Sequence, residues 1–107
     1  MKYLVVARPR DPIPPDQVVM LSEAAKQWYD RYADRFDSFG NFAGGGGYGI
    51  VTADDEESLW RAIWEMPFIP FSEVTVDPVW TGKDGFDLFA DVVRSMMQTM
   101  QGAQAPA

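Results

Sequence analysis

The first third of the chain changes from a strand-like pattern to a helix-like one. Tyr3 to Arg8 form an apolar run rich in β-branched residues, which predicts a mostly buried strand. The prolines in residues 9–15 exclude regular structure and predict an extended connector. From about Pro15, apolar residues recur every three or four positions, which predicts an amphipathic helix. Its apolar stripe consists of Val18, Leu21, Ala25, Trp28, Tyr32 and Phe36.

The rest of the chain predicts a hairpin, a helix, a strand and a final helix. Residues 37–53 contain two strand-like segments around a glycine-rich centre, which predicts a β-hairpin. Asp54 and Glu57 are spaced as a capping box that starts a second helix, and Pro67 ends it. Residues 71–80 alternate as a last strand, in which Pro78 indicates an edge position. The third helix begins near Asp84, and its apolar residues are Phe86, Phe89, Val92, Val93, Met96 and Met100.

The predicted order, βαββαβ followed by a helix, is that of a ferredoxin-like α+β domain. We expect one domain over residues 1–101 and a flexible tail over residues 102–107, because this length suits a single core. The antiparallel sheet should have the order 4-1-3-2 with both inner helices on one face. The other face would be bare, and a second copy of the sheet is the usual cover. We therefore expect a homodimer or a higher homo-oligomer.

Composition narrows the range of partners and chemistry. Sixteen acidic against nine basic residues give a net charge of −7, which argues against nucleic acid and against an anionic membrane surface. The chain has no cysteine and no apolar stretch long enough to span a bilayer, so a cytoplasmic location is expected. It also has no histidine, which excludes Ser-His-Asp catalysis and histidine metal ligation. We expect neither a metal nor a cofactor.

Aromatic residues are unusually frequent. Four Trp, four Tyr and seven Phe suit either a cavity for a small hydrophobic or aromatic ligand or an aromatic subunit interface. Trp60 and Trp64 lie one helical turn apart and are better explained by core or interface packing than by substrate contact.

The segment from Met66 to Phe71, Met-Pro-Phe-Ile-Pro-Phe, is followed by a strand and resembles the turn before the last strand of muconolactone isomerases. The resemblance covers about residues 1–80. It implies a dimeric α+β barrel and a proton-shuttling isomerisation of an unsaturated lactone in a pocket between helix and sheet. By this resemblance, Glu23 falls near the sequence position of a carboxylate in the first helix of that family. Tyr48 falls near the position of a tyrosine in the family's hairpin. The family carries a histidine in the hairpin, where this chain has Gly44 to Gly47.

Glu23 and Tyr48 are the candidate catalytic residues. Glu23 would act as a general base if aromatic neighbours such as Trp28 desolvated its carboxylate. The alternative is a solvated helix residue, since glutamate is rarely buried. Tyr48 would donate a proton to an enolate-like oxygen, or would be an ordinary strand aromatic.

The candidate substrate-binding residues surround the same predicted pocket. Arg8 would hold a substrate carboxylate, or would form a surface ion pair. Asn41 would orient a carbonyl, or would serve the turn. The glycine run opens into a strand rather than a helix, so it is not a phosphate loop, and its missing side chains would widen the pocket mouth. The aromatic lining would come from Trp28, Tyr32 and Phe42.

Two functions fit these features. One is a cofactor-independent isomerase or cyclase that acts on a small unsaturated or polycyclic carbonyl compound or lactone. The other is a non-catalytic module of the same fold that binds a small molecule or serves assembly. An inward Glu23 near Tyr48 would favour the first function, and a solvent-exposed Glu23 would favour the second.

Overall fold

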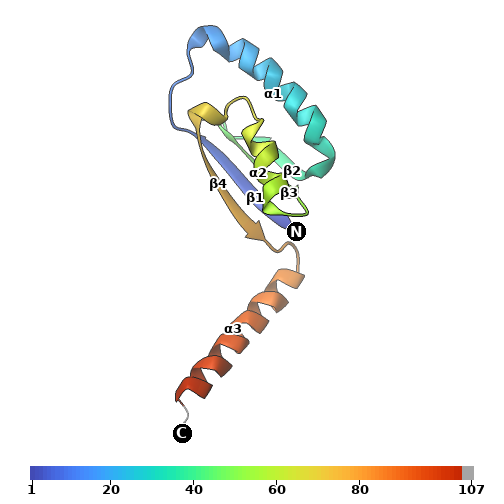
Figure 1. The fold of residues 1–107 in the computed structure, drawn as a ribbon, viewed down its shortest axis with the longest axis vertical. Coiled ribbons are helices and arrows are strands. Elements are labelled where there is room, and N and C mark those ends of the chain that lie inside the picture. Colours follow the sequence, from blue (N-terminus) through green and yellow to red (C-terminus); the bar gives the residue numbers. More distant parts are fainter. Residues whose placement is uncertain (105–107) are drawn as a thin grey trace.

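The computed structural model describes residues 1–104, which form one four-stranded antiparallel sheet with helices (Figure 1). The strand order is β2-β3-β1-β4, as the sequence predicts. The apolar run near the N-terminus forms an inner strand, paired on one side with the hairpin and on the other with the last strand. The strands are β1 (Lys2–Pro9), β2 (Phe36–Asn41), β3 (Gly47–Thr52) and β4 (Ser72–Val79).

Helices α1 (Val18–Tyr32) and α2 (Glu56–Trp64) cover one face of the sheet. The buried core under them joins Tyr3 of β1 and Val51 of β3 to Leu59 and Ile63 of α2. The predicted ferredoxin-like α+β fold with an additional C-terminal helix is therefore confirmed.

The opposite face of the sheet, here called the open face, follows from strand alternation. Tyr3 and Ala7 of β1 are buried beneath the helices, so Leu4, Val6 and Arg8 point the other way. Val6 is paired with Tyr48 of β3, and directly paired residues project to the same face. The open face therefore carries Leu4, Val6, Arg8, Tyr48, Ile50, Thr75 and Asp77.

Two element boundaries differ from the sequence prediction. The first helix ends at Tyr32, and a 3₁₀ turn, Ala33–Arg35, leads into β2 at Phe36. Phe36 is therefore a strand residue and not the last member of the helical stripe, although its ring still packs against Trp28 with 5.7 Å between the centroids. The cap of α2 is Asp55 rather than Asp54, since the Ser58 amide donates to Asp55 Oδ1 at 2.7 Å.

Helix α3 (Asp84–Gln104) follows β4 and projects away from the sheet, which makes the molecule 69 Å long and less than 30 Å wide (Figure 1). Its apolar side chains are exposed, among them Phe86 at 79% and Phe89 at 65%. The helix extends past residue 101 into the expected tail, and residues 105–107 of that tail lie outside the described part. None of the helices described is long and apolar enough to cross a membrane.

The Asp55 cap predicts a pH-dependent contribution to stability. Hydrogen bonds from Ser58 lower the pKa of the Asp55 carboxyl below the usual 3.8. The contribution is therefore present above the unfolded-state pKa and is lost as pH falls through the lower folded-state pKa. Asp55→Ala should unfold more easily than wild type at pH 7, and the difference should disappear in strong acid.

Asp55→Asn is the matched control, because asparagine also caps helices and does not titrate. Urea unfolding of the three proteins across the acid range measures the effect. An Asp55→Ala deficit that does not change with pH would contradict the capping account.

Candidate ligand cavity

A cavity of about 370 Å³ lies between α1 and the covered face of the sheet. Ala25, Trp28 and Tyr32 of α1 form one wall, and Val5 and Ala7 of β1 form part of the floor. The lining is mostly apolar, so the cavity suits a ligand with an extended hydrophobic surface. Other elements contribute Phe39, Asn41, Leu59, Ile63, Phe68 and Phe71.

Glycines of the hairpin leave the floor of the cavity without side chains. A Cβ atom at Gly49 would lie 2.9 Å from the Phe36 ring, and one at Gly47 would lie 2.9 Å from the Gly40 carbonyl oxygen. Gly46 has a φ of +83°, and its Cβ would lie 2.2 Å from the Ala7 carbonyl oxygen. The glycine run therefore permits the tight hairpin and keeps space free below α1.

Trp28 connects α1 to α2. Its indole Nε1 donates to the carbonyl oxygen of Ala62 at 2.8 Å, and the side chain is only 8% exposed. Ala62 lies in the last turn of α2, where carbonyls lack partners within the helix. Met66, whose amide would otherwise reach Ala62, donates to Ile63 instead. The Trp28 indole thus satisfies a free helix carbonyl and sets how α1 lies over the cavity.

Tyr32 and Arg35 border the end of the cavity near the C-terminus of α1. The Tyr32 hydroxyl donates to the Glu65 carboxylate, and this hydrogen bond raises the pKa of Tyr32. The Arg35 guanidinium lies over the Tyr32 ring, 5.4 Å from its centroid. Within residues 1–104, no carboxylate lies within 4.0 Å of the Arg35 guanidinium. This end of the cavity therefore presents an unneutralised positive charge.

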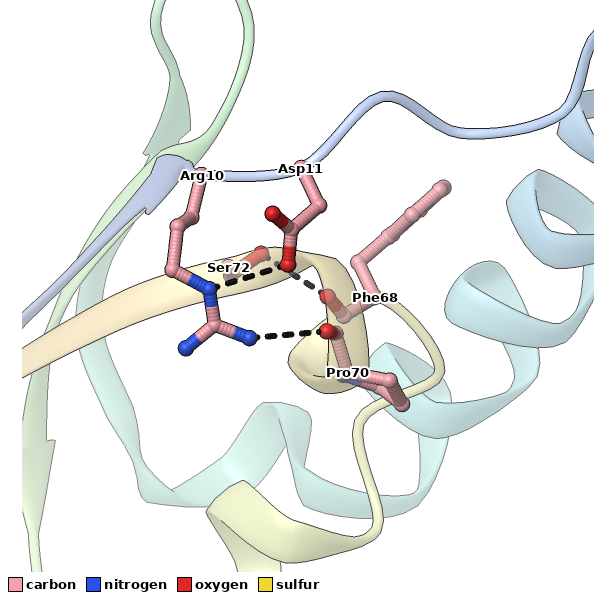
Figure 2. Close-up of polar contacts among 5 residues, drawn as sticks. All are labelled: Arg10, Asp11, Phe68, Pro70 and Ser72. Carbon is pink, nitrogen blue, oxygen red and sulfur yellow. Dashed lines mark hydrogen bonds and ion pairs between the residues drawn. The ribbon is translucent and has the colours of Figure 1, made fainter.

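Asp11 borders the cavity where the connector leaves β1. Its carboxylate accepts a hydrogen bond from Arg10 Nε at 3.0 Å, and Arg10 Nη2 donates to the Pro70 carbonyl at 3.0 Å (Figure 2). The amides of Arg10 and Asp11 both donate to the Phe71 carbonyl, at 2.9 and 3.1 Å. The hydroxyl of Ser72 donates to the Phe68 carbonyl at 2.8 Å. The connector is therefore fastened to the turn before β4.

Three of the residues predicted to bind substrate do line this cavity. Trp28 and Tyr32 lie on its α1 wall, and Asn41 lies at the end of β2. Asn41 is paired with Gly47, and a Cβ on that glycine would lie 3.3 Å from Asn41 Oδ1. Their contact with a substrate stays a prediction.

Glu23 lies outside the cavity, contrary to the pocket predicted from the sequence. Its side chain is 63% exposed and forms an ion pair with Lys26 at 3.1 Å. The reason is helical phase, because Glu23 and Ala25 are two residues and so roughly 200° apart around α1. With Ala25 facing the cavity, Glu23 faces solvent and is not the desolvated carboxylate that the sequence analysis expected.

Arg8 and Phe42 do not line the cavity, and they gather with Tyr48 at the open face. The Arg8 guanidinium lies 4.6 Å from the Phe42 ring centroid, and the rings of Phe42 and Tyr48 are 5.5 Å apart. Tyr48 borders the cavity as part of β3, but its ring lies over Gly40 of the neighbouring strand. Strand alternation separates this cluster from Trp28 and Tyr32, so a single pocket containing all five residues does not form.

Asp11 and Arg35 are cavity residues that the sequence analysis did not identify. Arg35 has a recognisable signal, because it continues the spacing of Trp28 and Tyr32 at i+7 and i+3 and so lies near the same side of the helix axis. Asp11 follows an irregular connector, where no periodicity indicates its direction.

Comparisons with known proteins support the fold. Residues 1–93 match the family model described as "Domain of unknown function (DUF3303)". No curated protein matches the sequence. Among solved structures, muconolactone isomerase is similar with a TM-score of 0.67 and 18% identity over 78% of this chain and 92% of that chain. A second similar structure is the 5-chloro-2-hydroxyhydroquinone dehydrochlorinase TftG of Burkholderia phenoliruptrix AC1100, in complex with 2,5-dihydroxybenzoquinone. Its TM-score is 0.65 and its identity 16%, over 79% of this chain and 99% of that chain. The resemblance to muconolactone isomerases is thus confirmed as a likeness of fold.

The contact between Trp28 and Ala62 predicts a measurable loss of stability when the indole is removed. Trp28→Phe keeps an aromatic ring but leaves the Ala62 carbonyl without its donor, which should cost about 1–3 kcal/mol of unfolding free energy. Trp64→Phe is the matched control, because Trp64 is 70% exposed and should change stability by less than about 0.5 kcal/mol. Chemical unfolding followed by circular dichroism measures both variants. Equal effects of the two substitutions would contradict the anchoring role of Trp28.

Proposed function

Because the chain belongs to the family described as "Domain of unknown function (DUF3303)", we propose its function from its geometry: it binds a small, flat, largely apolar molecule in the cavity beneath α1. The observation that carries the proposal is the cavity itself, about 370 Å³ in volume and lined by aromatic side chains and bare glycine backbone. Ligand sites are commonly clefts of this size with few polar groups.

A second candidate is catalysis by proton transfer, as in an isomerase or cyclase that acts on an unsaturated carbonyl compound or lactone. The fold likeness to muconolactone isomerase and to TftG favours it. Of the two residues proposed as catalytic, Glu23 would have to act from outside the cavity, while Tyr48 borders it with its ring over Gly40 of the neighbouring strand. Asp11 is the carboxylate among the lining residues and replaces Glu23 as the candidate general base by position alone, since its side chain is also 56% exposed and is paired with Arg10.

We also propose that the chain forms a homodimer or a higher homo-oligomer, in which a second copy covers α3 and the open face. The apolar residues Phe86, Phe89, Val93, Met96 and Met100 are spaced alternately by three and four, as in a helix–helix seam. They are exposed to solvent, and a helix without tertiary packing has little stability of its own. A dimer that buries these side chains would remove apolar surface from water and would stabilise α3 by tertiary packing.

Ligand binding is tested by filling the cavity. Ala25→Trp places a large ring between α1 and the sheet and should weaken binding of the neutral fluorescent probe N-phenyl-1-naphthylamine by roughly tenfold or more, because packed interiors have no spare space. Gln27→Trp is the control, since residue 27 is exposed and does not border the cavity. Fluorescence titration gives both affinities. Undiminished binding to a folded Ala25→Trp protein would refute this site.

Assembly is tested by removing α3. Sedimentation equilibrium of the full chain at micromolar concentration should give a multiple of the 12.0 kDa protomer mass. A chain that ends at Lys83 should associate at least about tenfold more weakly, because it lacks the apolar seam. A chain that ends at Gln104 keeps the helix and should associate like the full chain. A 12.0 kDa monomer for the full chain would refute the assembly.

A further inference from the structure

Charge is distributed unevenly along the cavity. Of the residues that line it, two carry a formal charge, Asp11 and Arg35. Asp11 lies two residues beyond the end of β1. Arg35 precedes Phe36 of β2. Phe36 pairs with Val51 of β3, and Val51 pairs with Tyr3 of β1, so Arg35 lies near the start of β1. At about 3.3 Å per residue, β1 from Tyr3 to Pro9 spans roughly 20 Å, so the two charges lie near opposite ends of an elongated site.

The two charges differ in how far they are already neutralised. The Asp11 carboxylate accepts a hydrogen bond from Arg10 Nε at 3.0 Å, so its own chain balances it. Arg35 has no such partner among the described residues, although the whole chain has a net charge of −7. In so acidic a protein, an arginine without a carboxylate partner at an apolar cavity is free to pair with a ligand.

The Arg35 guanidinium is also held in position at the cavity. It lies 5.4 Å from the centroid of the Tyr32 ring, a cation–π distance. The Tyr32 ring packs in turn against Trp28 with 5.7 Å between the centroids, and Trp28 is fixed to α2 by its indole hydrogen bond. Arg35 is an exposed residue, and its stacking on this ring is the contact that directs its guanidinium to the cavity.

We infer that Arg35 selects ligands with an anionic group: the cavity takes an elongated, flat, apolar molecule whose acidic oxygen, a carboxylate or phenolate, lies at the Arg35 end. The inference rests on the proposed binding function and adds which class of ligand the cavity prefers. A planar guanidinium matches a carboxylate with two parallel hydrogen bonds. At the opposite end Asp11 is paired with Arg10, so Arg35 is the charged group left to orient the anion along the cavity.

The test compares two probes with the same aromatic skeleton. N-phenyl-1-naphthylamine is neutral, and 8-anilino-1-naphthalenesulfonate adds one negative charge. Arg35→Gln should weaken binding of the sulfonate by about fivefold, the effect of one partly exposed ionic hydrogen bond, and change binding of the neutral probe by less than about twofold. Arg61→Gln is the charge-matched control, because Arg61 pairs with Glu57 at 2.8 Å and does not border the cavity. It should alter neither affinity.

Only the part of each signal that Ala25→Trp abolishes is counted, which excludes probe bound to the exposed α3 helix. A loss of sulfonate affinity with retained neutral-probe affinity supports the role of Arg35. If Arg35→Gln weakens both probes equally or neither, the charge selection is refuted while the cavity remains a binding site. If Ala25→Trp changes neither signal, the proposed binding function fails together with the inference.

Discussion

The hydrogen bond from the Trp28 indole to the Ala62 carbonyl, 2.8 Å long, joins the two helices that cover the sheet. It satisfies a carbonyl in the last turn of α2 and brings the aromatic side of α1 over β2 and β3. The rings of Trp28, Tyr32 and Phe36 then line one end of the space between helix and sheet. Toward the glycine-rich hairpin no large side chain rises from β3, and the cavity remains. The packing of α1 against α2 and the cavity beneath α1 therefore both depend on the position in which the Trp28 hydrogen bond holds α1.

Much of the fold follows from periodicity. The apolar β-branched run of residues 3–8, the alternation in residues 71–80 and the helical spacing that starts near Pro15 predict strands and a helix that the structure contains. Local patterns do not locate boundaries as well. Phe36 continues the helical spacing of Trp28 and Tyr32, yet it pairs with Val51 as a strand residue, because tertiary pairing with the hairpin outweighs helix continuation. Asp54 and Asp55 are equally good caps by residue type, and the backbone geometry selects Asp55.

The site is harder to predict than the fold. The direction of a side chain depends on its position around a helix axis or on its place in the alternation of a strand. The family resemblance and the nearby Trp28 both point to Glu23, although it lies off the apolar stripe that contains Ala25 and Trp28. Arg8 and Tyr48 are in the strands next to cavity residues, but one step of alternation turns each toward the open face. Trp28 and Tyr32 line the cavity, because their spacing of four residues places both side chains on the side of α1 that faces the sheet. The direction of Asp11 depends on a connector fastened to a distant turn, which no local pattern encodes.

The indole N–H of Trp28 offers the most direct measurement of ligand binding in the cavity. In a ¹⁵N-labelled protein, each of the four tryptophans gives its own indole signal. On titration with N-phenyl-1-naphthylamine, the account predicts that the Trp28 indole signal shifts, while those of the exposed Trp64 and Trp80 keep their positions. Shifts at Trp64 or Trp80 with an unchanged Trp28 signal would show that the probe binds the surface, and would contradict a ligand site beneath α1.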